Sequence, residues 1–215
     1  MPFKVSNLNW FHEDRNMNNL FKYLIISTIL IGLISVGYFT YLRLNEDSLK
    51  TETMIIDNLT PEKNQEWIFF TDRVMGGISS GKLEIGSESG SKFYRMTGDV
   101  STANNGGFIQ FRADLTRLSN TDKIFNGIKI KVRGNDENYN IHIRTNRTVL
   151  PWQYYSLEFY APKKWTEIEL PFDSFKRSNF YQPKGFKSSD IRTLGIVAYG
   201  RDYVANLDVG LIEFY

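Results

Sequence analysis

The sequence contains no cysteine among its 215 residues. This absence excludes a disulfide framework, a zinc site built on thiolates and a cysteine nucleophile. Histidine is also scarce, and His142 is the only histidine after residue 50. We therefore expect no metal site with nitrogen or sulfur ligands. A calcium site made of oxygen ligands stays open, although the chain has no EF-hand spacing. Because many exported proteins also lack cysteine, its absence does not identify the compartment.

Most of the chain has no excess of positive charge. The net charge of +2 comes from residues 1–44, which hold four basic and two acidic residues. Residues 45–215 hold 22 residues of each sign. Proteins that bind nucleic acids usually carry a clear basic excess, because they neutralise phosphates. We therefore expect no nucleic-acid partner.

Alanine, the strongest helix former, occurs at only five positions, whereas aromatic residues make up 15% of the chain. From about residue 65 onward, short strand-like runs recur between turn residues. In Gly127–Arg133 and Tyr139–Arg144, apolar residues alternate with polar ones, as half-buried antiparallel strands require. The other runs are Trp67–Phe70, Lys82–Ile85, Lys92–Val100, Phe108–Arg112, Tyr154–Tyr160, Thr166–Leu170, Thr193–Tyr199 and Leu207–Phe214. The sequence thus predicts an all-β jelly-roll β-sandwich over residues 65–215.

One long apolar segment lies near the N-terminus. Residues 23–42 are twenty uncharged residues between Lys22 and Arg43. A helix of this length measures about 30 Å, the thickness of the hydrocarbon core of a bilayer. The run is longer than the apolar core of a signal peptide, lacks a small-residue cleavage site, and lacks the polar stripe of a core helix. We predict one transmembrane helix over residues 23–42, in contact with the lipid bilayer.

This helix predicts the organisation of the rest of the chain. Residues 1–22 form an N-terminal tail, and the polar residues 43–64 form a linker to the sandwich. Basic residues are slightly more numerous before the helix than directly after it. We therefore expect a single-pass protein with a cytoplasmic N-terminus and its C-terminal domain on the opposite side.

Residues 76–82 show the spacing of a phosphate-binding P-loop, G-x-x-x-x-G-K. Leu83, however, stands where a Ser or Thr would bind magnesium, and the following residues predict a strand instead of a helix. We interpret the segment as a glycine-rich connection between strands. No cofactor is expected.

The remaining polar residues give no catalytic group. His142 shares a strand face with Asn140 and Arg144, without an acidic partner nearby in the sequence, so we interpret it as a solvated or hydrogen-bonded surface residue. Glu167 and Glu169 alternate with apolar residues, which favours a solvent-facing strand over a glycosidase pair. We expect the protein not to be an enzyme.

Several aromatic residues allow two interpretations. Trp152, Tyr154 and Tyr155 are able to stack on sugar rings, or else to pack in the core and support strands. A carbohydrate-binding module predicts an exposed row of rings, formed by Trp152, Tyr154 and Tyr181, on a concave sheet face.

Two turn-forming segments are the candidate binding surfaces. In residues 72–81, Asp72 is able to accept backbone hydrogen bonds that fix the glycine loop, and Met75 offers an adaptable apolar contact. The segment Asn104–Gly107 favours a tight turn, because Asn and Gly tolerate left-handed backbone conformations. The candidate binding residues are Asp72, Met75, Gly76, Gly77, Ser79, Gly81, Asn104, Asn105, Gly106 and Gly107.

These two segments resemble the complex I intermediate-associated protein 30 family. The first block is W-x-x-F-x-D-x-V-M-G-G-x-S-S-G, which runs from Trp67 to Gly81, and the second is N-N-G-G-F, which ends at Phe108. Weaker matches follow, among them Trp165 with L-P-F-x-x-F at residues 170–175. The likeness covers about residues 52–215.

The resemblance implies a jelly roll similar to galactose-binding domains and some carbohydrate-binding modules, and a non-catalytic role. Mitochondrial members help to assemble the membrane arm of respiratory complex I. Plant relatives, in which the domain is joined to a reductase-like domain, serve photosystem biogenesis. This chain has no G-x-G-x-x-G unit of a reductase, and it has an apolar helix where a mitochondrial presequence is expected.

The hypothesis that follows is a membrane-anchored binding domain that acts as an assembly or scaffold factor. Its partners would be subunits of a membrane protein complex, either similar to respiratory complex I or photosynthetic. The alternative hypothesis is a membrane-tethered carbohydrate-binding module with a glycan partner.

Overall fold

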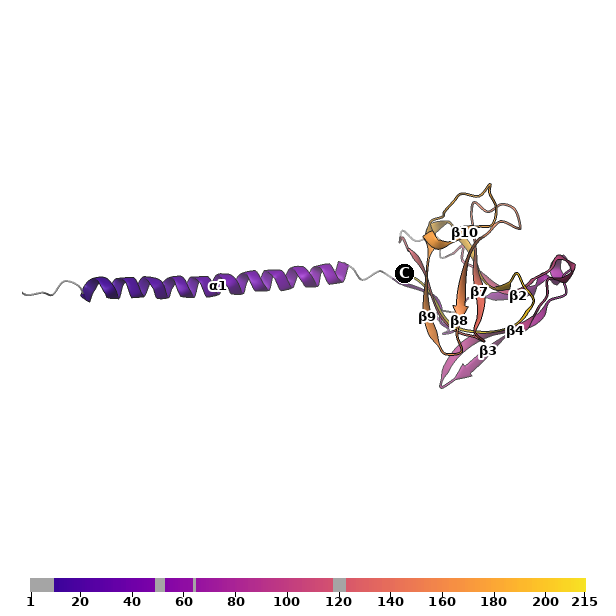
Figure 1. Ribbon diagram of the computed structural model, residues 1–215, viewed down its shortest axis with the longest axis horizontal. Helices are drawn as coiled ribbons and strands as arrows, with labels where there is room; N and C mark the ends of the chain where they lie inside the picture. The colour runs from indigo at the N-terminus through magenta and orange to yellow at the C-terminus, as the bar shows by residue number, and fades with distance from the viewer. Residues whose placement is uncertain (1–9, 49–52, 64, 118–122) are drawn as a thin grey trace, which may run out of the picture. The chain divides into compact units, whose positions relative to one another are not determined.

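The computed structural model describes residues 10–48, 53–63, 65–117 and 123–215 (Figure 1). The chain divides into two compact units, residues 1–51 and residues 52–215. The first unit holds one helix, and the second holds the strands.

The helix, α1, covers Trp10–Ser48. Within it, Lys22–Leu42 is long and apolar enough to cross a membrane, and its side chains are exposed. The hydroxyls of Ser27, Thr28 and Ser35 each donate to a carbonyl three residues earlier, at 2.8 Å. These polar groups are thus satisfied within the helix, as an apolar environment requires.

The helix extends beyond the predicted span of residues 23–42 at both ends. Residues 10–22 of the predicted tail and 43–48 of the predicted linker are helical as well. Neither stretch contains a proline or glycine that would interrupt the backbone hydrogen bonds. Residues 1–9 of the predicted tail lie outside the described residues.

The second unit is a sandwich of two antiparallel sheets. The first sheet has the order β3-β4-β12-β6-β9, and β1 pairs with the end of β12. Its strands are β1 (Met54–Asp57), β3 (Ser80–Glu88), β4 (Ser91–Val100), β6 (Gly127–Arg133), β9 (Thr166–Pro171) and β12 (Tyr203–Phe214).

The second sheet has the order β10-β8-β7-β11-β5-β2. Its strands are β2 (Trp67–Thr71), β5 (Phe108–Asp114), β7 (Glu137–Thr145), β8 (Tyr155–Ala161), β10 (Lys176–Arg177) and β11 (Ile191–Tyr199). Among the described residues, four short 3-10 helices lie in the connections: η1 (Asp72–Met75), η2 (Ala103–Asn105), η3 (Phe172–Ser174) and η4 (Ser188–Asp190).

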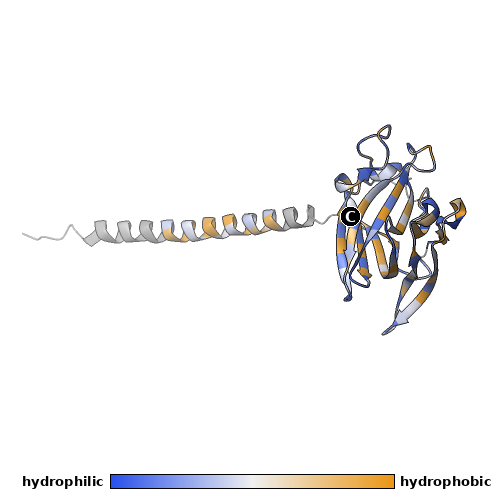
Figure 2. Cartoon of the chain, turned by 45° about the vertical axis from the view of Figure 1, so that its right-hand side comes forward, coloured by the Kyte–Doolittle hydropathy of each residue, from blue (hydrophilic) through white to orange (hydrophobic). Residues whose placement is uncertain are grey.

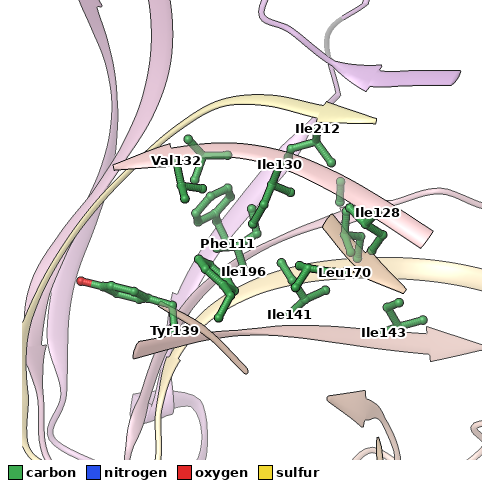
Figure 3. Close-up of a cluster of buried hydrophobic side chains, with 14 of the residues drawn as sticks. Phe111, Ile128, Ile130, Val132, Tyr139, Ile141, Ile143, Leu170, Ile196 and Ile212 are labelled. Carbon is green, nitrogen blue, oxygen red and sulfur yellow. The ribbon is translucent and has the colours of Figure 1, made fainter. Parts of the chain in front are cut away.

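The core fills the space between the two sheets. Ile128 and Ile130 of β6 point toward Ile141 and Ile143 of β7, and all four side chains are fully buried (Figure 3). Hydrophilic and hydrophobic residues alternate along the strands (Figure 2). Alternation places one set of side chains in the core and leaves the other on the outer face.

The ten predicted strand-like runs are all confirmed, and two strands were missed. The predicted linker, residues 43–64, is wrong in its second half because it contains β1. Met54 pairs with Phe214, and the buried Asp57 carboxylate accepts hydrogen bonds from Trp67 Nε1 at 2.7 Å and Tyr94 Oη at 3.0 Å. The four residues of β1 alone do not predict these partners, which are distant in the sequence. The other missed strand, β10, has only two residues.

The buried core predicts a large stability difference between two isoleucines. Ile196 is fully buried and Ile85 is 65% exposed. We expect Ile196→Ala to lower the free energy of unfolding by about 2–5 kcal/mol, because it leaves a cavity. Ile85→Ala, the matched control, should change it by less than about 0.5 kcal/mol. Urea denaturation followed by tryptophan fluorescence measures both, and equal losses would contradict this core.

Candidate functional site

Asp72 lies at the centre of the first candidate surface. It begins η1 directly after β2, and its side chain is fully buried. The carboxylate accepts hydrogen bonds from the backbone N–H groups of Gly107 at 2.6 Å and Ser79 at 2.9 Å. It also accepts from Phe108 N at 3.3 Å and from the hydroxyl of Ser79. The predicted hydrogen-bonding role of Asp72 is therefore confirmed.

Ser79 connects this carboxylate to the residue that follows β4. Its hydroxyl oxygen, which donates to Asp72, accepts a hydrogen bond from Ser101 N at 2.9 Å. Ser101 directly follows β4. The network therefore joins residues 72–81 to residues 101–108, two loops that are far apart in the sequence.

Two of the predicted glycines are required by this network. A Cβ atom on Gly77 would lie 2.3 Å from Asp72 Cγ, and one on Gly106 would lie 2.4 Å from Asp72 Oδ2. Both distances are far below van der Waals contact, so any side chain would displace the carboxylate. The glycines of the two sequence blocks thus allow the backbone to approach Asp72 closely.

The hydrogen bonds outweigh burial in their effect on Asp72. Burial alone would raise the pKa of Asp72, whereas the Ser79 hydroxyl and the N–H groups of Gly107, Phe108 and Ser79 lower it. The net result is a pKa below the ordinary value of 3.8. Asp72 is therefore ionised at neutral pH, and the hydrogen-bond donors around its carboxylate stabilise the negative charge.

The loop above this carboxylate exposes three apolar side chains. Val74 is 72% exposed, Met75 is 67% exposed and Ile78 is 50% exposed. We name Val74, Met75 and Ile78 the apolar loop surface. Asn104 and Asn105 are also exposed, and both adopt left-handed backbone conformations with φ of 57°.

The structure divides the candidate binding residues into two groups. Exposed residues, which are accessible to a partner, are Met75, Gly76, Gly81, Asn104 and Asn105. Residues that are buried or half-buried, and that hold the loops, are Asp72, Gly77, Ser79, Gly106 and Gly107. Val74 and Ile78 were not among the predicted binding residues. Their position inside a glycine-rich turn was the feature of the sequence that indicated exposure. Contact of any of these residues with a partner stays a prediction.

His142 lies on the predicted face of β7 and is half-buried there, so the prediction of a solvated surface residue holds only in part. Its ring stacks on Tyr154, with ring centres 4.1 Å apart and planes 17° apart, and Tyr199 packs edge-on at 5.4 Å. Within the described part of the chain, its buried Nε2 atom has no hydrogen-bond partner. Burial lowers the pKa of His142 to about 4, so the ring is neutral at pH 7.

The predicted row of exposed rings on a sheet face does not form. Trp152 and Tyr181 are 60% and 87% exposed, but they lie in turns outside the strands. Tyr154 packs against His142, and Tyr155 is fully buried. Core packing is therefore the correct interpretation of Tyr155. His142, Tyr154 and Tyr199 form one group of contacting rings on the outer face of the second sheet.

The two antiparallel sheets define the class: the domain is a jelly-roll β-sandwich similar to carbohydrate-binding modules. The chain belongs to the family of complex I intermediate-associated protein 30, whose model matches residues 56–208. This match includes both blocks, Trp67–Gly81 and Asn104–Phe108. No curated protein matches the sequence.

The solved structures similar to this chain share its fold. One is the family 11 carbohydrate-binding module of the cellulosomal cellulase Lic26A-Cel5E of Clostridium thermocellum. It is 17% identical, covers 76% of this chain and 94% of its own, and has a TM-score of 0.60. A second structure of the Clostridium thermocellum family 11 module holds a β-1,3-1,4-mixed-linked tetrasaccharide; it is 17% identical, covers 75% and 94%, and has a TM-score of 0.59.

A module of a different family is similar as well. The family 30 module of the cellulosomal cellulase Cel9D-Cel44B of Clostridium thermocellum is 12% identical and covers 76% of this chain and 97% of its own, with a TM-score of 0.52. At these identities the likeness establishes the fold alone.

The Asp72 network predicts a pH-dependent effect of Asp72→Asn. Because the amide is neutral and has one acceptor oxygen, we expect a loss of about 1–3 kcal/mol in the free energy of unfolding at pH 7. A lowered pKa stabilises the fold above pH 3.8, and this contribution disappears as the pH falls through the folded-state value. The loss should therefore shrink below pH 3.8.

Chemical denaturation at pH 7 and at pH 3 measures this effect. Asp99→Asn is the matched control, because Asp99 is exposed. A loss that is equal for both variants, or that is the same at both pH values, would contradict the role of the Asp72 carboxylate.

The partial burial of His142 between Tyr154 and Tyr199 predicts an unusually acidic titration. We expect its ring signals in NMR spectra to stay constant from pH 8 to pH 5 and to shift with a midpoint of about 4. Because the folded-state pKa lies below the ordinary 6.5, stability from the neutral ring is complete above pH 6.5 and declines toward pH 4. His12→Gln leaves His142 as the single histidine. A midpoint near 6.5 would show that water reaches the ring.

Proposed function

We propose that this protein is a membrane-anchored, non-catalytic binding domain that acts as an assembly or scaffold factor for a membrane protein complex. The complex is similar to respiratory complex I or is a photosynthetic one. The observation that carries the proposal is the apolar loop surface, which lies in the family's first sequence block and is held by the buried Asp72. Membership of the complex I intermediate-associated protein 30 family supports it.

The apolar loop surface exposes its three side chains to water. Three large apolar side chains within five residues are costly to leave in water, and burial of each against a partner contributes about 1.5–3 kcal/mol. The Asp72 hydrogen bonds hold the loop in one conformation. Less conformational entropy is therefore lost when a partner binds.

The anchor supplies the second part of the mechanism. A bilayer that holds residues 23–42 restricts the domain, because the chain from Leu42 to Met54 spans at most about 40 Å when fully extended. Confinement raises the effective concentration of the apolar loop surface at membrane-bound subunits. In this proposal the N-terminus is cytoplasmic and the domain lies on the opposite side.

The titratable groups of the site support a role in binding without catalysis. The Asp72 carboxylate is buried beneath the loop and accepts four hydrogen bonds. His142 is neutral and covered by Tyr154. Neither group is placed to transfer a proton to a bound substrate.

A glycan is the second candidate partner. Its support is the ring group His142, Tyr154 and Tyr199 on the outer face of the second sheet, where Tyr199 is 44% exposed. Exposed aromatic rings stack on the apolar faces of sugars. The similar family 11 module that holds a tetrasaccharide makes this candidate worth testing.

The proposal predicts site-specific crosslinking in native membranes. Because the chain has no cysteine, Met75→Cys and Ile85→Cys each create one attachment point for a photoreactive maleimide. Both positions are at least 65% exposed. We expect Met75→Cys to capture subunits of one membrane complex and Ile85→Cys to capture none of them.

A change in the surface tests the same contact. Adding Val74→Ser and Ile78→Ser to Met75→Cys should reduce the yield at least about tenfold, since two buried apolar contacts are lost. Recovery of no subunit through Met75→Cys, together with binding of mixed-linkage β-glucan oligosaccharides by the full chain, would contradict the assembly role and favour the glycan.

A further inference from the structure

A cavity of about 240 Å³ lies at the outer face of the second sheet. Three neighbouring strands and the connection after β7 line it. Its lining includes Arg112, Asp114, Arg144, Thr148, Arg192 and Thr193. We name this cavity the arginine pocket.

Strand register brings these residues together. Thr193 of β11 pairs with Asp114 of β5 on one side and with Arg144 of β7 on the other. Arg112 precedes Asp114 on β5 by two residues and therefore lies on the same face of the sheet. Residues that are about 30 to 80 positions apart in the sequence thus line one pocket.

The pocket carries an excess of positive charge. It holds three arginines and one carboxylate, that of Asp114. The Asp114 carboxylate already accepts a hydrogen bond from Thr116 N at 2.8 Å. Within the described residues, none of the three guanidinium groups forms a salt bridge. Two positive charges in the pocket are therefore without a matching negative charge.

The excess of positive charge affects the guanidinium group of Arg144. Its guanidinium donates to the carbonyl oxygens of Leu150 at 3.1 Å and Thr148 at 3.5 Å, which fix its direction without neutralising it. Burial, followed by the positive charges of Arg112 and Arg192, lowers the pKa of Arg144. A bound anion would relieve this repulsion.

A second, independent feature is the hydroxyl of Thr193. Its Oγ1 atom is buried and, across the described part of the chain, has no hydrogen-bond partner. An unsatisfied buried hydroxyl destabilises a fold, because its hydration is lost and no hydrogen bond replaces it. Because Thr193 lines the arginine pocket, an anion there would accept a hydrogen bond from Oγ1.

We propose that the arginine pocket binds a phosphate or sulfate group, either as the free anion or as an ester on a larger ligand. Such tetrahedral anions present several acceptor oxygens, which suit guanidinium forks and one hydroxyl donor at the same time. Two unmatched positive charges suit a doubly charged anion.

The surroundings of the pocket define two sources for an esterified anion. Residues 146–154 include the lining residue Thr148, and residues 176–190 contact them through the hydrogen bond from Ser178 Oγ to the Trp152 carbonyl oxygen at 2.9 Å. Together the two segments contain five basic residues, one acidic residue and three exposed rings, those of Trp152, Phe180 and Tyr181. Basic residues with Trp and Tyr are typical of surfaces at a lipid headgroup region. The ring group His142, Tyr154 and Tyr199, which includes a residue two positions before Arg144, suits a phosphorylated or sulfated sugar.

Calorimetric titration with inorganic phosphate tests the proposal. The full chain is kept in a non-ionic polyoxyethylene detergent, which contains neither phosphate nor sugar, and chloride holds the ionic strength constant. We expect saturable binding of phosphate to the unchanged chain. Arg192→Gln should weaken it by at least about tenfold, because a charged hydrogen bond is lost.

Two further variants separate binding from folding. Thr193→Val keeps the side-chain shape, so it should leave the fold as stable as before, or more stable, in the absence of phosphate and should still weaken phosphate binding. Arg73→Gln makes the same change of charge at an exposed position in η1 and should leave phosphate binding unchanged.

Parallel titrations with dihexanoyl phosphatidylglycerol and glucose 6-phosphate identify the source. Tighter binding of the lipid than of inorganic phosphate assigns the pocket to a headgroup, and tighter binding of the sugar phosphate assigns it to a modified sugar. Equal or weaker binding of both esters assigns it to the free anion. The proposal is overturned if phosphate gives no more heat than chloride, or if Arg192→Gln and Thr193→Val both bind phosphate as the unchanged chain does.

Discussion

The buried carboxylate of Asp72 is the constraint on which the candidate surface depends. Four hydrogen-bond donors from two loops surround it, and in the described structure no salt bridge neutralises its charge. An ionised group is tolerated in such a place only when donors replace its hydration. The same requirement explains the glycines at 77 and 106, because a Cβ at either position would occupy the space of the carboxylate. The exposure of Val74, Met75 and Ile78 follows from this loop geometry.

Most of the fold was predictable because each sheet has one apolar face. In β6 and β7 the buried residues recur at every second position, and this period is visible in the sequence. β1 was not predictable, because its four residues lie among polar neighbours and depend on pairing with β12, more than 150 residues later. The helix extends beyond the predicted span of residues 23–42, since hydropathy marks the apolar span and does not mark where backbone hydrogen bonding ends.

The candidate site was predictable only in part. The acceptor role of Asp72 followed from an acidic residue placed before a glycine-rich turn. The exposure of Val74 and Ile78 did not, because apolar residues are usually assigned to a core. His142 looked solvated, since its cover, Tyr154, depends on the register of β7 and β8. Arg112, Arg144 and Arg192 come from three strands, and only the order of those strands brings them to one pocket.

We propose that the Asp72 carboxylate holds the two loops together and thereby forms the surface for a partner. Amide hydrogen exchange of the full chain, measured by NMR, tests it directly. Because the amide protons of Ser79 and Gly107 are donated to this buried carboxylate, we predict that both exchange slowly. The exposed amide of Asn104 should exchange quickly. Fast exchange at Ser79 and Gly107 would show that the loops open freely, and it would contradict the account.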